Sequence, residues 1–221
     1  MDFNDSQQEA AFRKEARDFL EANAEKRSII SDKPNDKSPQ IAVAGAPETV
    51  KGGKEAAQEA LERAKVWQKK KAEAGFAAIL WPKEFGGYGG SPIQQVIYSQ
   101  EEHDYLVPSG YFEIGIGMLG PTMMVWGKDE DKKRYLPKMI TGEEIWCQLF
   151  SEPSAGSDLA GIKMKAEKDG DEWVLNGQKV WTSGAHFADY GMIVARSDPS
   201  ALKHKGLTYF SLDMKTHGIE E

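Results

Sequence analysis

The sequence predicts an α+β protein in which an all-α N-terminal domain, residues 1–143, is followed by a β-rich domain, residues 144–221. Up to Gly142, apolar residues recur at helical spacing between capping residues and glycines; beyond it they alternate with a period of two. The chain has 221 residues, of which 40% are hydrophobic, so it is long enough for one large domain or two modest ones.

The first helix is expected to start at Ser6, which forms a capping box with Glu9. About five turns follow, because apolar residues recur at helical spacing; they are Phe12, Ala16, Phe19, Leu20 and Ala24. Residues 25–53 are rich in Ser, Pro, Asn, Asp, Lys and Gly, which predicts a polar surface insert. A helix over 54–74 then ends at Gly75.

Three more helices complete the N-terminal domain. One starts at Ser91, with proline at its first position and Gln94 closing a capping box, and runs to about Asp104. Residues 110–126 are apolar and dotted with glycine, which predicts a buried helix. Residues 128–136 form a charged helix whose acidic first turn suits the helix dipole.

The β-rich domain is expected to hold two loops at a set distance. Between loops 148–158 and 176–184 lie an alternating strand, an Asp169-Gly170 turn, a strand at 172–175 and an Asn176-Gly177 turn. In the alternating strand Ile162, Met164 and Ala166 share one face, and Lys163 and Lys165 the other. Two further strands are expected at 190–196 and 207–212.

Composition excludes several classes of function. The net charge is −7, without the clustered Lys and Arg that nucleic acid or an anionic membrane requires. Cys147, the single cysteine, excludes an internal disulfide and a cysteine-based zinc site, and we interpret it as a core residue. Met1 to Gln8 is polar, and no apolar run approaches the roughly 20 residues of a membrane span, so the cytoplasm is the default location.

Other patterns have simpler interpretations. Residues 115–120 match Gly-x-Gly-x-x-Gly, but Pro121 and the lack of βαβ alternation favour a small-residue helix over a dinucleotide site. Methionines 118, 123 and 124 either line an apolar pocket or fill a core. The four histidines lack metal-site spacing. The acidic run 101–104 indicates a solvated helix face.

The two loops together carry the groups that a flavin ring requires, an aromatic face and hydrogen-bond partners for a polar edge. Trp181 is suited to stack on the ring, worth about 0.5–1.5 kcal/mol beyond its buried area. Ser151, Thr182 and Ser183 offer hydroxyls for the edge, and the Gly156-Ser157 turn offers N–H groups for a phosphate or substrate carbonyl. The competing interpretations are a core tryptophan and an ordinary turn.

The sequence resembles the acyl-CoA dehydrogenases. The run SEPSAGSD at 151–158 is similar to the family's first signature, NGQKVWTS at 176–183 to its flavin-facing loop, and 127–142 to the end of its helical domain. The likeness extends from about Ser6 to Glu221, apart from the insert. It implies an N-terminal helical domain, a β-barrel-like middle domain, and truncation before a C-terminal four-helix domain. It also implies assembly as a homotetramer or homodimer.

The resemblance further implies roles for single residues in binding FAD and acyl-CoA. Phe150 and Ser151 are expected at the pyrimidine edge, Trp181 against the ring and Ser183 near N5, and Ser157 would also meet the substrate. The complete set implied for FAD is Gln148, Phe150, Ser151, Gly156, Ser157, Trp181, Thr182 and Ser183. Two departures stand out, because the family usually has Gly at position 154 and often an aromatic residue at 148.

The activity implied is α,β-dehydrogenation of an acyl-CoA, as in fatty acid β-oxidation, with hydride transfer to FAD N5 and electrons passed to an electron-transfer flavoprotein. The catalytic base of the family lies in the C-terminal domain, so it is expected beyond Glu221, and the fragment alone is expected to be inactive. An acyl-CoA oxidase of the same fold and a non-catalytic acyl-CoA-binding protein remain as alternatives.

Overall fold

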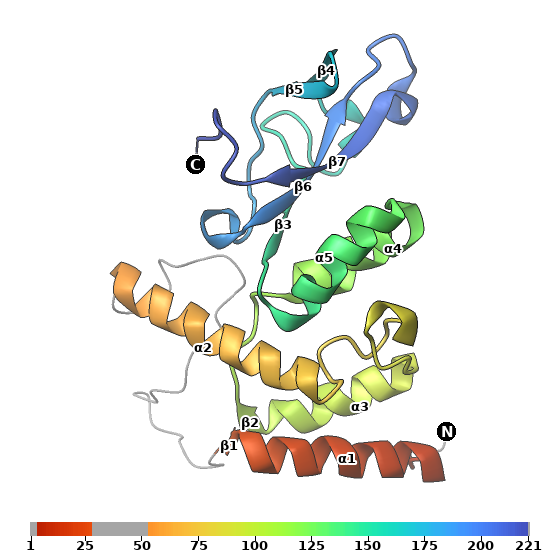
Figure 1. Ribbon diagram of the computed structural model, residues 1–221, viewed down its shortest axis with the longest axis vertical. Coiled ribbons are helices and arrows are strands. Elements are labelled where there is room, and N and C mark those ends of the chain that lie inside the picture. The colour runs from red at the N-terminus through yellow and green to blue at the C-terminus, as the bar shows by residue number, and fades with distance from the viewer. Residues whose placement is uncertain (1–3, 28–52, 221) are drawn as a thin grey trace. The chain divides into compact units, whose positions relative to one another are not determined.

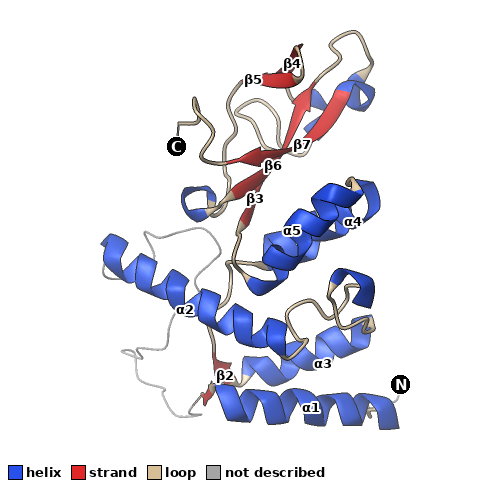
Figure 2. Cartoon of the chain, in the orientation of Figure 1, coloured by secondary structure: helices blue, strands red, loops and turns tan. Residues whose placement is uncertain are grey.

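The computed structural model describes residues 4–27 and 53–220 of the chain, which divides into two compact units, Met1–Glu143 and Glu144–Glu221. The first unit is built from helices and the second from strands (Figures 1 and 2). The predicted fold class, α+β with a helical N-terminal part, is therefore confirmed.

The start and end of the predicted insert at 25–53 belong to regular structure. Glu25 and Lys26 form strand β1 (Glu25–Lys26), which pairs antiparallel with β2 (Tyr105–Leu106). Helix α2 (Gly53–Glu73) begins at the last residue of the predicted insert. The remaining positions of that prediction, 28–52, lie outside the described residues. The sequence did not predict β1 and β2, because two residues are too few to show an alternating pattern.

Helix α1 (Gln7–Asn23) begins as its capping residues predict. The Ser6 N–H donates to Glu9 Oε2 at 2.6 Å, and the Glu9 N–H donates to Ser6 Oγ at 3.3 Å. The same reciprocal arrangement starts α3 (Pro92–His103) at Ser91. Such pairs satisfy N–H groups that have no partner inside the helix, which is why the two starts are readable from sequence.

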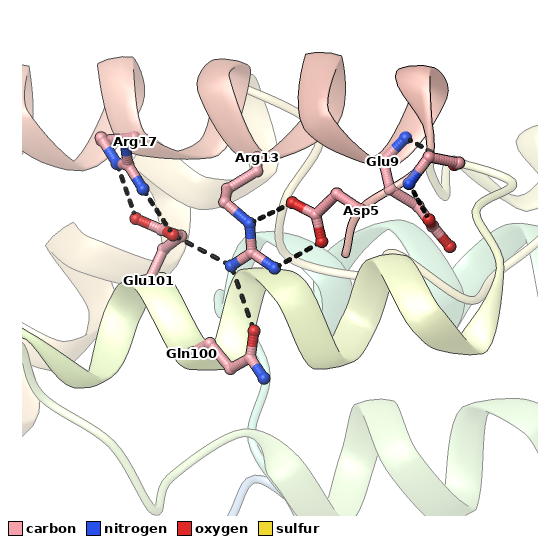
Figure 3. Close-up of polar contacts among 7 residues, drawn as sticks. Asp5, Glu9, Arg13, Arg17, Gln100 and Glu101 are labelled. Atoms are coloured by element: carbon pink, nitrogen blue, oxygen red, sulfur yellow. Dashed lines mark hydrogen bonds and ion pairs between the residues drawn. The ribbon is translucent and has the colours of Figure 1, made fainter. Parts of the chain in front are cut away.

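A charged network connects α1 to α3 (Figure 3). Glu101 accepts hydrogen bonds from Arg13 at 3.0 Å and from Arg17 at 2.9 and 3.0 Å, and Asp5 holds the other edge of the Arg13 guanidinium. The Glu101 side chain is only 12% exposed. The expectation of a solvated face at 101–104 is therefore wrong for Glu101, because α1 covers it with two arginines.

The apolar segment 110–126 is not the single buried helix that the sequence predicted. It forms a π-helical turn (Gly115–Leu119) followed by α4 (Gly120–Trp126), in which Val125 and Trp126 are 67% and 83% exposed. A Cβ on Gly120 would lie 2.1 Å from Cζ2 of Trp81, whose Nε1 donates to the Ile116 carbonyl at 2.8 Å. The glycine pattern at 115–120 thus lets a helix approach a tryptophan, as the small-residue interpretation expected.

The remaining helix of the first unit is α5 (Asp129–Thr141), with three acidic residues in its first turn. It ends at Gly142, whose φ of 76° is the left-handed conformation typical of a helix terminus. None of the described helices is long and apolar enough to cross a bilayer.

The second unit is a mixed five-stranded sheet with β6 (Tyr190–Arg196) at its centre. One edge of β6 pairs in parallel with β3 (Trp146–Leu149) and, at Arg196, with β4 (Lys165–Asp169); the other pairs antiparallel with β7 (Leu207–Asp213). Strand β5 (Glu172–Asn176) forms the expected hairpin with β4. Cys147 is buried in the core, as predicted.

This topology determines where the two predicted loops lie. Residues 150–189 form the connection between the parallel strands β3 and β6, and the β4–β5 hairpin stands in the middle of that connection. Parallel neighbours require a long crossover of this kind. Both loops therefore belong to one connection whose two ends are anchored in the same sheet.

Candidate functional site

The first loop leaves the sheet at the end of β3. Gln148 is half-buried in the strand opposite Met192, and the chain turns after Phe150. The Phe150 ring packs edge-on against Tyr209 of β7, with 5.4 Å between ring centroids. Desolvation at this position raises the pKa of Tyr209 to about 12, so its phenol stays neutral. The contact fixes Phe150 from the sheet side.

A tight turn shapes the rest of the first loop. Glu152 and Ala155 exchange backbone hydrogen bonds of 2.8 and 3.1 Å. The segment after this turn, with Gly156 and Ser157, is exposed. Within the described residues, neither of their N–H groups donates to a protein acceptor, and neither residue is hydrogen-bonded to the second loop.

The second loop runs from the end of β5 to the helical turn Ala185–Phe187. The Val180 N–H donates to the Ser151 carbonyl at 2.9 Å, which joins the two loops directly. Trp181 follows with its side chain 92% exposed and a φ of 59°. An L-residue in this left-handed region is strained by about 1–2 kcal/mol, and such strain tends to mark sites that bind something. Trp181 is therefore not the core tryptophan of the competing interpretation.

A buried ion pair gives a second connection between the loops. Lys179 Nζ lies 3.0 Å from Glu152 Oε1, and each side chain is 5% exposed. The ammonium also donates to the Phe150 carbonyl at 2.9 Å. The Glu152 carboxylate additionally accepts the N–H of Lys163 at 2.7 Å and that of Met164 at 3.0 Å. The pair thus connects both loops and the segment that leads into β4.

The environment of this pair lowers the pKa of both groups, for different reasons. Burial alone would raise the pKa of Glu152, but the Lys163 N–H, the Lys179 ammonium and the Met164 N–H more than offset it, so the pKa lies below its ordinary value. Desolvation lowers the pKa of Lys179, and Glu152 offsets this only in part. A carboxylate bound in this way is poorly suited to accept a proton from a substrate.

The predicted site residues therefore fall into two groups, those that are joined across the two loops and those that are not. The structure brings Phe150 and Ser151 next to Lys179 and Val180, immediately before Trp181. Gln148 stands in β3, and Gly156 and Ser157 lie beyond the Glu152 turn. Thr182 is half-buried and Ser183 exposed; within the described chain, their hydroxyls and that of Ser151 form no hydrogen bond to another residue.

The donors available here fit a flavin. An exposed indole, hydroxyls and unpaired backbone N–H groups match an aromatic face, a polar ring edge and an anionic pyrophosphate. They do not fit a metal ion, and no cluster of three potential ligands occurs in residues 4–27 and 53–220.

Sequence reasoning missed Glu152 and Lys179 as a pair. Both stand inside the two motifs, but their partnership joins positions 27 residues apart and has no local pattern. A usable signal did exist. Glu152 and Lys179 each stand beside apolar or small residues, in a loop expected next to a core. Because an unpaired charge is too costly to bury there, each charge should have a partner of opposite sign.

Comparisons with known proteins cover both units of the chain. The model of the acyl-CoA dehydrogenase N-terminal domain matches residues 47–143, and that of the middle domain matches 147–221. Acyl-CoA dehydrogenase IpdE1 of Mycobacterium tuberculosis strain H37Rv is 38% identical over 169 residues, which are 76% of this chain and 44% of that protein. The chain spans about half the length of such relatives.

Several solved structures, among them the following two, are similar over nearly the whole chain. The Tcur3481-Tcur3483 steroid ACAD has a TM-score of 0.75 at 31% identity, covering 99% of this chain and 50% of that one. The prolyl acyl carrier protein oxidase AnaB has a TM-score of 0.67 at 28% identity, covering 97% and 50%.

Proposed function

This chain belongs to the acyl-CoA dehydrogenase family, and on that premise we propose that it is the N-terminal and partial middle portion of a flavin-dependent acyl-CoA dehydrogenase. The observation that carries the proposal is the pair of joined loops, of which the second contains Trp181, an exposed tryptophan held in a strained conformation. An exposed, strained aromatic residue is readily explained by a flat ligand that covers it.

We assign FAD to the surface formed by these loops. Trp181 would lie against the ring, the hydroxyls of Ser151, Thr182 and Ser183 would serve its polar edge, and Phe150 would support that edge. The backbone N–H groups of Gly156 and Ser157 would bind the phosphates, because N–H groups without a protein acceptor suit anionic oxygens. Gln148 completes the set, and Ser157 also contacts the acyl-CoA.

When bound, FAD supplies a hydride acceptor at N5 and a route for electrons to an electron-transfer flavoprotein. The chain's own part is to orient the ring and to exclude water from it, while a carboxylate removes the α-proton of the thioester. Glu152 is committed to Lys179 and two backbone N–H groups. Glu152 is therefore not our candidate for this base. Because the chain spans about half the length of its relatives, we propose that the base lies outside these 221 residues and expect the chain alone to be inactive.

The visible spectrum of the purified protein, recorded anaerobically before and after adding saturated acyl-CoA thioesters, tests this function. Because one similar structure is named a steroid ACAD, the panel should contain ring-bearing as well as straight-chain thioesters. We expect a flavin band in the protein as purified, and bleaching by a thioester when the complete polypeptide is used. A protein that stays colourless and refuses added FAD contradicts the proposal.

An acyl-thioester oxidase is the second candidate, favoured by the likeness to AnaB. Rapid reoxidation of the bleached flavin by oxygen identifies an oxidase, whereas slow reoxidation that an electron-transfer flavoprotein accelerates identifies a dehydrogenase. A complete polypeptide that binds FAD and acyl-CoA without any bleaching would be the non-catalytic binding protein. We further propose that the protein is cytoplasmic and that it assembles as a homotetramer or homodimer. Light scattering of the purified protein tests the oligomeric state.

A further inference from the structure

The Glu152–Lys179 ion pair is poorly explained by stability alone. Removing two charges from water is costly, and apolar residues of similar volume at such a position are often as stabilising. An apolar cluster of Ala155, Ile162 and Val194 lies in the same unit, and Ala155 exchanges backbone hydrogen bonds with Glu152. What a charged, hydrogen-bonded pair adds to an apolar contact is a fixed direction and distance between the groups it joins.

The distances fixed here are those between the two loops. Lys179 donates from its side chain to the Phe150 carbonyl, and the next residue, Val180, donates from its backbone to the next carbonyl, Ser151. Two successive residues of one loop are thus bonded to two successive residues of the other. Trp181 is the residue that follows.

Glu152 fixes the same unit from its other side. Its two carboxylate oxygens accept the N–H groups of Lys163 and Met164, at the entrance to β4, as well as the Lys179 ammonium. The first loop is therefore held against the sheet and against the second loop by one side chain. Without Glu152, the Lys179 charge would be left buried and unpaired.

We propose that Glu152 and Lys179 are positioning residues for the flavin, an inference that rests on the proposed function. They act through the loops and not by contact with the ring, because both side chains are enclosed by protein. Their pairing sets the separation of Ser151 from Trp181, and thereby the fit of the ring between its edge partners and its aromatic face.

The test compares Lys179→Met, Glu152→Gln and the double variant with the wild-type protein. Lys168→Met is the matched control, because Lys168 carries the same side chain at an exposed position of β4. Three quantities are measured: the dissociation constant for FAD, the thermal unfolding midpoint, and hydrogen exchange of the Val180 N–H without FAD. The exchange rate reports the loop-to-loop bond independently of any cofactor.

We expect each single variant to raise the FAD dissociation constant by about tenfold or more, the scale on which outer-shell partners affect metal sites. Exchange at Val180 should accelerate in both, and Lys168→Met should change neither quantity. In the double variant no unpaired charge is buried, so the unfolding midpoint should recover toward wild type. FAD affinity and Val180 protection should not recover with it.

Wild-type FAD affinity and wild-type Val180 protection in the folded double variant would overturn the inference, since the pair would then be a structural contact only. Unchanged FAD affinity in the single variants would overturn it as well. If the single variants do not fold, the double variant decides. If the wild-type protein binds no FAD, the proposed function fails. In that case, unchanged hydrogen exchange of the Val180 N–H in the double variant would also refute the positioning role. Faster exchange would show that the pair still holds the two loops together.

Discussion

Replacing Trp181 by glycine and, separately, by alanine measures the strain that the structure places at this residue. Both substitutions remove the same indole, which is 92% exposed, so little apolar burial is lost in either. They differ in tolerance of the left-handed backbone, because glycine adopts a φ of 59° without a steric penalty and alanine does not.

The expected difference follows from two opposing terms. At an ordinary position alanine is more stabilising than glycine by about 0.4–1 kcal/mol, because glycine loses more chain entropy on folding. A left-handed L-residue is destabilised by about 1–2 kcal/mol, which reverses the sign. We therefore expect the Trp181→Gly variant to have a larger free energy of unfolding than the Trp181→Ala variant, by up to about 1.6 kcal/mol.

The control pair is Gln178→Gly and Gln178→Ala, in the same loop at an exposed residue without positive φ. Here alanine should be the more stable by about 0.4–1 kcal/mol. Urea unfolding followed by far-ultraviolet circular dichroism is the assay, because it does not depend on the tryptophan that is removed. Both Trp181 variants should bind FAD more weakly than wild type.

Two results would refute the reasoning. If alanine is the more stable at both positions, the Trp181 backbone is not left-handed in solution. If both Trp181 variants lose more than about 2 kcal/mol, the indole packs against protein, and its exposure cannot be explained by a missing ligand.

Other substitutions test the rest of the fold. Hydrogen bonds from Arg17 lower the pKa of Glu101; burial opposes this effect, and Arg13 adds to it. The Glu101 carboxyl therefore binds fewer protons in the folded protein than in the unfolded chain. The free energy of unfolding should thus fall as the pH drops below about 4.5, and it should fall less steeply in the Glu101→Gln variant. Gly120→Ala should lose about 1–3 kcal/mol in thermal unfolding, through overpacking against an indole, whereas Gly117→Ala, with open space around its Cβ, should lose nothing. Gly177→Ala should also lose about 1–3 kcal/mol in urea unfolding, because its Cβ would lie 2.7 Å from a methionine side chain at a φ of 157°.

Local chemistry made the helix starts and most strands predictable. Ser6 and Ser91 form the capping boxes that their neighbours indicated, since a capping box lies within four residues. The strand expected at 190–196 matches β6, and the Asp169-Gly170 turn joins β4 to β5 as expected, but β4 (Lys165–Asp169) begins only near the end of the alternating run 162–166. The sequence also pointed to the two loops, through residue types that suit a flavin.

The features that escaped prediction depend on residues distant in the chain. The sequence around Glu101 indicates a solvated residue, and only the position of α1 shows that two of its arginines form ion pairs with Glu101. The Glu152–Lys179 pair and the positive φ of Trp181 arise from the way the sheet brings two loops together. The exposure of Val125 and Trp126 likewise contradicts the buried helix predicted from composition, because composition alone does not show whether an apolar helix is covered by other parts of the protein.

The crossover between β3 and β6 also sets an order of folding events. The β4–β5 hairpin joins neighbours in sequence and can close early, whereas pairing Trp146 with Tyr190 must first close a long chain segment. The bond from Val180 to Ser151 spans the hairpin and depends on both steps. In a refolding experiment, the amides of the hairpin should therefore gain protection before that of Val180, so the surface that would receive the cofactor is completed only after the sheet that carries it.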